Sequence, residues 1–210
     1  MEKTPPEPDA AKPGARVASL LVLGLLGGAT GAMAALHLVQ PMLDPLQEPV
    51  SFYVHGPQGW LLSVALSTFG AAVIIMSWVA GDALRRPSSC ALLLFGGGML
   101  VTAIIPSDRW FPWETKPTMA GLAHAGAAMV APLALLLPMF AFRRLELRRS
   151  SQVLRWSTFV YAAALLASAL SLTIGFFADR APPLIGLAER MLALAAVTWI
   201  GFGTWRLAGA

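Results

Sequence analysis

The chain contains six apolar runs, each about as long as a bilayer is thick. A helix needs roughly 20 mainly apolar residues to cross the hydrocarbon core, and backbone groups in lipid must bond within their own segment. Hydrophobic residues make up 57% of the chain and charged residues only 12%, outside the range of ordinary soluble domains. We therefore predict an all-α membrane protein, a six-transmembrane helix bundle. Its expected helices cover about 17–40, 59–80, 88–106, 118–142, 153–178 and 184–207.

The segment before the first run is polar and rich in proline. It reads MEKTPPEPDAAKPGA, and such a composition cannot bury enough apolar surface to fold. We expect a disordered cytoplasmic tail over 1–16, followed by a single six-helix transmembrane domain over 17–210. Ala32, Met33 and Ala34 resemble a signal-peptidase site, but the apolar run continues to Val39, which favours a retained helix.

The basic residues predict the orientation, because cytoplasmic loops carry an excess of Lys and Arg. Only Arg109, Lys116 and Arg180 fall on one face, and Arg190 lies inside the last helix. The other face therefore points to the cytoplasm, with both termini, in a bacterial cytoplasmic (inner) membrane. The bases that share it are Lys3, Lys12, Arg16, Arg85, Arg86, Arg143, Arg144, Arg148, Arg149, Arg155 and Arg206.

Topology accounts for the net charge of +4, so we expect no nucleic-acid partner. The expected partner is the lipid bilayer itself. The Arg-rich loop over 143–149, RRLELRR, is a candidate contact for anionic lipid headgroups.

Ionisable residues gather near the opposite, outer face. His124 in the fourth helix, and Glu189 with Arg190 in the sixth, are each expected roughly 9 Å below the outer helix starts. Asp108 follows the third helix at the same level. Charged groups in hydrocarbon normally face the bundle interior and find partners, so these four side chains are expected to partner one another. The outward-facing site is expected to be built from Asp108, His124 and Arg190, with Glu189, Ser51 and His55 as lesser candidates.

Several interpretations of this polar cluster remain open. An internal ion-pair network that fixes helix packing is the structural one. Asp108, His124 and His55 form a weak candidate site for a divalent metal, and Asp108 with His124 could also move a proton. We favour a non-enzymatic role in sensing, lipid binding or scaffolding. The alternatives are a membrane-embedded hydrolase, possibly metal-dependent, acting on lipid or ester substrates at the outer leaflet, and a small transporter or proton-coupled carrier.

Small residues predict where helices approach closely. Gly24 with Gly28 and Gly27 with Gly31 have small-xxx-small spacing, and GGG at 96–98 is expected to act likewise in the third helix. Close contacts within the molecule are expected from both. Two prolines, Pro132 and Pro138, should bend or loosen the fourth helix.

Four motifs in order resemble a known family. They are SFYVHGPQGWL, IIPSD, TMAGLAHAGAA and GLAERM, and they resemble the bacterial integral membrane proteins grouped as domain of unknown function 998. The resemblance runs from about residue 17 onward and implies a six-helix membrane protein. It departs from the expected pattern at Ser107 and in a longer, Trp-rich loop. The matching positions are Ser51, Gly56, Gly59, Trp60, Pro106, Asp108, His124, Gly186 and Arg190.

Overall fold

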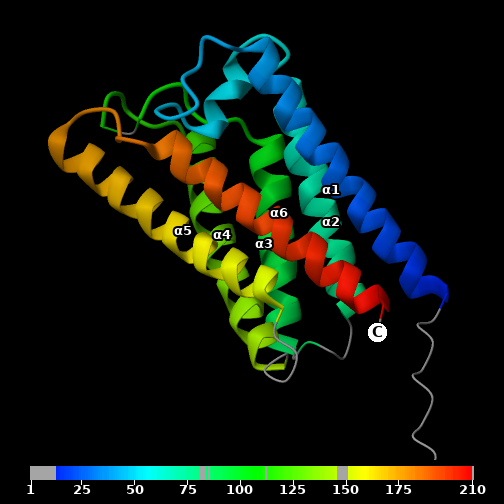
Figure 1. Ribbon diagram of the computed structural model, residues 1–210. Helices are drawn as coiled ribbons and strands as arrows, with labels where there is room; N and C mark the ends of the chain where they lie inside the picture. Colours follow the sequence, from blue (N-terminus) through cyan, green and yellow to red (C-terminus); the bar gives the residue numbers. More distant parts are fainter. Residues whose placement is uncertain (1–12, 81–83, 85, 112, 146–150, 210) are drawn as a thin grey trace, which may run out of the picture.

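Six long helices make up nearly all of the regular structure (Figure 1). The computed structural model describes residues 13–80, 84, 86–111, 113–145 and 151–209, and every regular element in them is helical. All six long helices are apolar and long enough to cross a membrane, which confirms the predicted bundle for this part of the chain. The elements are α1 (Pro13–Val39), η1 (Val50–His55, a 3₁₀ helix), α2 (Trp60–Ala80), α3 (Arg86–Ile104), α4 (Met119–Leu145), α5 (Gln152–Ala178) and α6 (Ile185–Gly209).

Two predicted segments fall wholly or partly outside the described residues. The expected tail covers 1–16, and α1 begins at Pro13, a residue suited to the first helical position. Residues 1–12 lie outside the described part. The Arg-rich segment 143–149 is described only as far as Leu145, where α4 ends.

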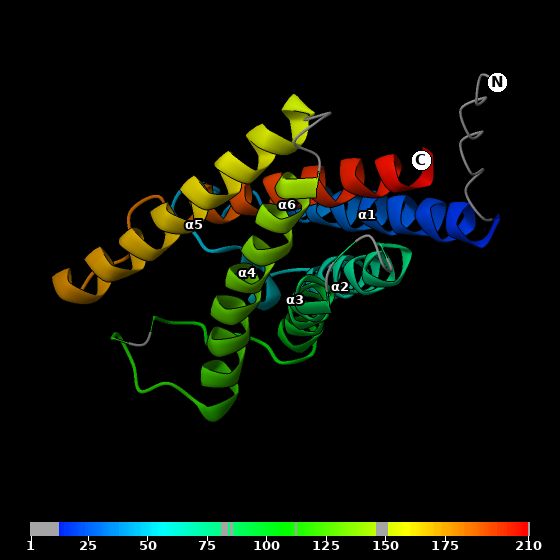
Figure 2. The same ribbon diagram turned by 90° about the horizontal axis from the view of Figure 1, so that it is seen from below.

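The helices pack mainly on their neighbours in sequence. α1 to α4 follow one another side by side, α5 and α6 form a hairpin, and α6 returns against α1 (Figures 1 and 2). Three connections lie at one end of the bundle, here called the η1 end: the one that contains η1, the described residues of 105–111 and 113–118, and residues 179–184 (Figure 1). The start of α1 and the end of α6 lie at the opposite end, here called the termini end (Figure 1).

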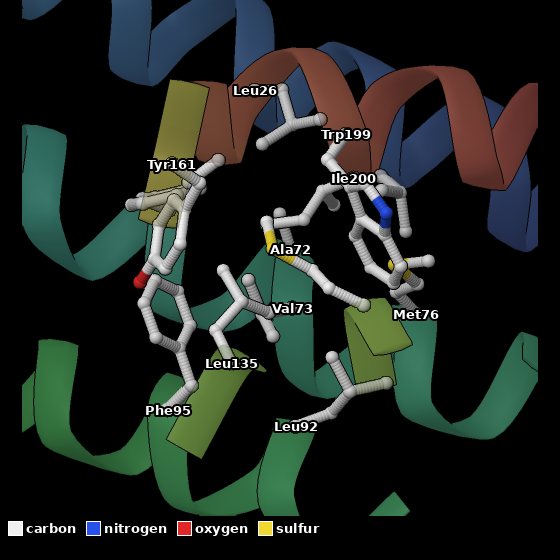
Figure 3. Packing of buried hydrophobic residues seen from close by; sticks show 14 of the residues in the cluster. Leu26, Ala72, Val73, Met76, Leu92, Phe95, Leu135, Tyr161, Trp199 and Ile200 are labelled. Carbon is white, nitrogen blue, oxygen red and sulfur yellow. The ribbon is translucent and has the colours of Figure 1, made fainter. Parts of the chain in front are cut away.

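The main core lies in the half of the bundle toward the termini end. All six long helices contribute to it, and Trp199, Ile200, Leu135 and Met76 are almost fully buried (Figure 3). A smaller cluster of Leu36, Tyr53 and Leu62 lies beneath η1. Apolar packing therefore fixes the helices at one end, whereas polar contacts dominate at the other.

Close helix contact occurs at α2, α3 and α4, but not at the glycine rows of α1. A Cβ atom on Gly70 would lie 2.7 Å from the Gly96 carbonyl oxygen, and one on Gly98 would lie 2.5 Å from the Cβ of Ala131. The expectation for the third helix is thereby confirmed. The expectation for α1 is wrong, because nothing lies within 4 Å of a Cβ built on Gly24, Gly27, Gly28 or Gly31. Sequence spacing marks a smooth helix face but does not say what that face meets.

Pro132 and Pro138 both lie within α4, which is assigned as one helix through them. The carbonyl of Pro132 accepts a hydrogen bond of 2.9 Å from the Tyr161 hydroxyl of α5. This bond joins α4 to α5 at the edge of the main core.

Candidate functional site

The chain between α1 and η1 packs directly on the first turn of α6. The backbone N–H of Leu187 donates to the Leu46 carbonyl at 3.1 Å, and that of Leu184 donates to Gln47 Oε1 at 3.2 Å. These bonds satisfy N–H groups that a helix start leaves without partners. A side chain at Gly186 would collide with the Glu48 and Pro45 carbonyl oxygens. Glycine therefore occupies this position because two backbone segments meet there.

Arg190 holds this junction together one turn further along α6. Its Nε donates to Nε2 of His37 at 2.8 Å, and one terminal nitrogen donates to the Glu48 and Gly186 carbonyls at 3.0 and 2.8 Å. The other terminal nitrogen donates to the Tyr53 hydroxyl at 3.0 Å, and the guanidinium lies 5.4 Å from the Tyr53 ring centroid. These contacts join α6 to α1 and η1. We call His37, Glu48, Tyr53, Glu189 and Arg190 the Arg190 cluster.

The hydrogen bonds of His37 define its protonation state. Arginine can only donate, so Nε2 of His37 must be an unprotonated acceptor. Nδ1 lies 2.8 Å from the Met33 carbonyl, which can only accept, so Nδ1 carries the hydrogen. His37 is thus neutral, with both ring nitrogens occupied. Its ring also packs 5.0 Å from that of Tyr53, measured between centroids.

Glu189 has a different partner from its neighbour Arg190. One of its carboxylate oxygens accepts a 2.7 Å hydrogen bond from the backbone N–H of Val50, the first residue of η1. Glu189 and Arg190 therefore bind the connection that contains η1 at different points. Within the described residues no hydrogen bond joins these two side chains.

Gln40, just after α1, fixes the far side of η1. Its Nε2 donates to the Tyr53 carbonyl at 2.9 Å and to the Pro57 carbonyl at 2.6 Å. A Cβ on Gly56 would collide with the buried Gln40 side chain, and one on Gly59 would collide with the Val54 carbonyl. The two glycines of HGPQGW are therefore required by close packing around η1.

A second group of polar contacts closes the connection between α3 and α4. The two carboxylate oxygens of Asp108 accept hydrogen bonds from the Thr118 hydroxyl at 2.6 Å and its backbone N–H at 2.9 Å. The Thr118 hydroxyl in turn accepts from the Gly121 N–H at 2.9 Å, as a helix N-cap does. Nδ1 of His124 bonds to the Ile105 carbonyl at 2.6 Å. We call Ile105, Asp108, Thr118, Gly121 and His124 the Asp108 cluster.

The surroundings of Asp108 favour its charged form. Hydrogen bonds from the Thr118 side chain and then from its backbone lower the pKa of the Asp108 carboxyl below its ordinary value. Partial burial raises the pKa, and nearby His55 and His124 lower it. The charge therefore stabilises the start of α4 from the side of the loop.

The expected single cluster of Asp108, His124, Glu189 and Arg190 is wrong in its pairing. All four lie toward the η1 end, but α4 packs on α3 whereas Arg190 faces α1 and η1. Within the described residues Arg190 makes no hydrogen bond to Asp108 or Glu189, because its hydrogen bonds go to His37, Tyr53 and backbone carbonyls. Counting residues gave similar depths, but which side of the bundle each group faces depends on helix packing.

Ser51 and His55, two of the lesser candidates, lie outside both clusters. The Ser51 carbonyl accepts a 3.2 Å hydrogen bond from the Ser107 hydroxyl, which ties η1 to the connection after α3. His55 is exposed and acts on Asp108 only through its charge. Within the described residues no three His, Cys, Asp or Glu side chains are grouped so that they could hold a metal ion. The metal hypothesis for Asp108, His124 and His55 therefore lacks a ligand set here.

Sequence reasoning missed His37, Tyr53 and Gln40. An arginine within a membrane-spanning helix needs several acceptors, but the sequence does not show which residues supply them. For His37 the expected helix bounds gave a usable signal. It lies in the last turn of α1 and Arg190 lies near the start of α6, so both are close to the η1 end. Gln40 had no comparable signal.

Comparison with protein families gives one match that spans most of the chain. The family described as Protein of unknown function (DUF998) matches residues 22–206. No curated protein and no solved structure matches the chain. The match covers both the Arg190 cluster and the Asp108 cluster.

Proposed function

We propose, for this chain as a member of the DUF998 family, a non-enzymatic role as a proton-sensing membrane protein. The sensor is the contact between His37 and Arg190, which joins α1 to α6 at the η1 end. The observation that carries the proposal is that a neutral histidine accepts a hydrogen bond from a permanent cation.

Protonation of His37 removes the acceptor on which this contact depends. A protonated imidazole has two N–H donors and no lone pair for the Arg190 Nε–H. It also places a second positive charge beside a guanidinium that keeps its own proton. A histidine side chain can gain a proton under conditions in which arginine keeps its own, so this contact is the place where an added proton would act. Acidification thus weakens the connection between α1 and α6.

Other ionisable groups near His37 do not replace this contact. Tyr53 of η1 accepts from Arg190 through its hydroxyl, and Glu48 contributes its backbone carbonyl. Glu189, from the same helix as Arg190, accepts from the Val50 N–H. The remaining Tyr53 and carbonyl contacts hold Arg190 in place, so loss of the His37 contact changes helix packing without unfolding the protein.

The bonding of the other polar residues supports a non-enzymatic role. Four of the five N–H groups of Arg190 already make hydrogen bonds within the protein. Both oxygens of Asp108 are occupied by Thr118, and His124 bonds to a backbone carbonyl rather than to Asp108. These residues are arranged to hold connections in place.

The proposal includes an orientation, with the η1 end outside the bacterial inner membrane and the termini end in the cytoplasm. The excess of Lys and Arg in the segments at the termini end supports it. The His37–Arg190 contact then responds to the pH of the outer compartment.

Distance measurements between spin labels in lipid nanodiscs test the sensor. Labels are placed on cysteines at Leu38 of α1 and Leu187 of α6, both exposed, with Cys90→Ser as background. Lowering the pH from about 8 to about 5, across the range in which histidine titrates, is expected to shift or broaden the α1–α6 distance distribution.

His37→Gln is the matched control, because a glutamine oxygen can accept from Arg190 but does not titrate. It is expected to keep the high-pH distances at both pH values, although His55 and His124 are still present. Arg190→Gln is expected to give the altered distribution at both pH values. An equal pH response in wild type and His37→Gln would refute the sensor.

A further inference from the structure

The half of α4 toward the η1 end contacts the protein along a single stripe. From Met119 to Val130 only Gly121 and His124 are buried, and Ala127 is half-buried. This stripe faces α3, since His124 bonds to Ile105 and Gly98 of α3 packs on Ala131. Most of the remaining circumference is exposed, and most of it is Ala or Gly.

The facing half of α5 shows the same pattern. Beyond Tyr161 its buried residues are Ala164, Ser171 and Gly175, which again form one stripe. That stripe packs on α6 and the segment before it, because the Ser171 hydroxyl bonds to the Pro183 carbonyl and Gly175 packs against Pro182. Within the described residues, the sides of α4 and α5 that face each other therefore lack a protein partner toward the η1 end.

Side-chain contacts bound the region between these two helices at both ends. Near the main core, the Tyr161 hydroxyl bonds to the Pro132 carbonyl. At the η1 end, Trp113 stacks on Phe111 at 5.0 Å and meets Phe176 of α5 edge-on at 6.1 Å, measured between ring centroids. The two helices diverge toward the η1 end, as the view from below shows (Figure 2).

The region is long enough to span one leaflet of a bilayer. At about 1.5 Å per residue, α4 rises about 20 Å from Pro132 to Met119, about two thirds of a 30 Å hydrocarbon core. Ala125 and Ala128 lie seven and four residues before Pro132, so they continue the face of α4 that Tyr161 contacts. Both are exposed, and their small side chains leave room for an acyl chain.

Three basic side chains on the connections at this end have no partner in the described part of the chain. Arg109 and Lys116 lie on the connection that carries Trp113, and Arg180 follows α5; all three are exposed. Trp113 contacts Phe176, and a Cβ on Gly175 would contact both Trp113 and the Arg180 carbonyl, so the two connections adjoin.

The carboxylates on these connections are bound differently from the bases. Asp108 accepts from Thr118, and Glu114 accepts from the backbone N–H of Phe111. Asp179 stays exposed beside Arg180. The three acids on these connections balance the charge of the three bases. The bases without partners are therefore expected to bind the phosphate group that all phospholipids carry, rather than to select lipids with a net negative charge.

We propose that a glycerophospholipid of the leaflet at the η1 end binds between α4 and α5. Its phosphate contacts Arg109, Lys116 and Arg180, and an acyl chain lies along Ala125 and Ala128 above the Tyr161–Pro132 contact. The aromatic residues Phe111, Trp113 and Phe176 separate the headgroup from the chain. This binding site is independent of His37 and Arg190, which lie on the α1 side of α6.

Native mass spectrometry of the detergent-purified protein tests the site with added phosphatidylglycerol, phosphatidylethanolamine and diacylglycerol. Wild type is expected to retain one phospholipid, with similar affinity for the first two and much weaker binding of diacylglycerol, which lacks phosphate. The Arg109→Gln, Lys116→Gln, Arg180→Gln triple variant is expected to lose at least about tenfold in affinity.

Two further variants separate a specific site from general lipid contact. Ala128→Trp, which fills the face of α4 above Pro132, is expected to remove the bound phospholipid while the protein stays monodisperse. Ala34→Trp on the exposed side of α1, and the Arg16→Gln, Arg86→Gln, Arg155→Gln triple variant at the termini end, serve as matched controls that retain it. Equal retention by the two triple variants, or equal binding of diacylglycerol, overturns the proposal.

Discussion

At the scale of single residues, the polar side chains of this protein connect segments that are far apart in sequence through hydrogen bonds. Arg190 reaches His37 and Tyr53, which precede it by more than 130 residues, and Glu189 reaches Val50. An unpaired charge in hydrocarbon costs a few kcal/mol, so each partner is needed for the other to be tolerated. The motif residues with the strongest chemical character are therefore also the ones that hold η1 in place.

Replacement of Gly56 by alanine tests the packing around η1. The added Cβ would collide with Gln40, whose buried side chain is held by two backbone carbonyls and cannot move away cheaply. We expect Gly56→Ala to lower the free energy of unfolding by about 1–3 kcal/mol. Titration with denaturing detergent measures this, with Gly126→Ala as control because nothing lies within 4 Å of a Cβ there. Equal stability of the two variants would contradict the packing.

The Asp108 carboxylate gives a pH-dependent prediction. Its pKa is lowered in the folded protein, first by the Thr118 side chain, so its charge stabilises the fold at pH values above 3.8, the ordinary value. This contribution is lost as pH falls through the lowered pKa. We expect Asp108→Asn to melt at a lower temperature than wild type at pH 7. The difference should shrink in melting curves recorded below pH 3.8, and a difference that is constant with pH would show that Thr118 does not stabilise the charge.

At the scale of helices, small residues decide which pairs pack closely, but only where a partner faces them. The Gly70 and Gly96 backbones bring α2 and α3 together, and Gly98 does the same for α3 and α4. The glycines of α1 are spaced four residues apart, as in a close-packing motif, but they face open space. Close packing is a property of a helix pair rather than of one helix.

Paired alanine substitutions measure this difference. Gly70→Ala places a Cβ 2.7 Å from the Gly96 carbonyl oxygen and is expected to destabilise the protein by about 1–3 kcal/mol. Gly28→Ala meets nothing within 4 Å and is expected to be neutral, or stabilising by up to about 1 kcal/mol through helix propensity. Thermal unfolding in detergent reports both. Strong destabilisation by Gly28→Ala would mean that α1 packs through its glycines after all.

At the scale of the whole molecule, the three polar connections lie together at one end, and the residues that begin α1 and end α6 lie at the other. The proposed proton sensor and the proposed phospholipid site are both at the η1 end, on different sides of α6. The orientation of the bundle therefore decides which compartment's pH would act on the His37–Arg190 contact and which leaflet would supply the phospholipid.

Labelling of single cysteines in intact cells tests that orientation. In a Cys90→Ser background, Lys116→Cys at the η1 end is expected to react with a membrane-impermeant maleimide added outside. Gln152→Cys, at the start of α5, is expected to react only after the membrane is opened. Both positions are exposed, so access to solvent is matched. The reverse pattern would place the η1 end in the cytoplasm.

The sequence by itself determined the number of long helices and their bounds to within a few residues. Hydrophobic length is a local property, and lipid forces every apolar run of that length into a helix. It also singled out Gly56, Gly186, Asp108, His124 and Arg190 through the family motifs, and family membership agrees with that resemblance. These conclusions need no knowledge of which helix touches which.

Only the tertiary structure decided how the polar groups pair. Depth along a helix follows from residue counting, but the direction in which a side chain points depends on the packing of its helix. Asp108 and His124 therefore belong with α3 and Thr118, whereas Arg190 belongs with His37 and Tyr53. The divergence of α4 from α5 likewise depends on helix packing and could not be predicted. Ala and Gly residues look alike in sequence whether or not a neighbouring helix covers them.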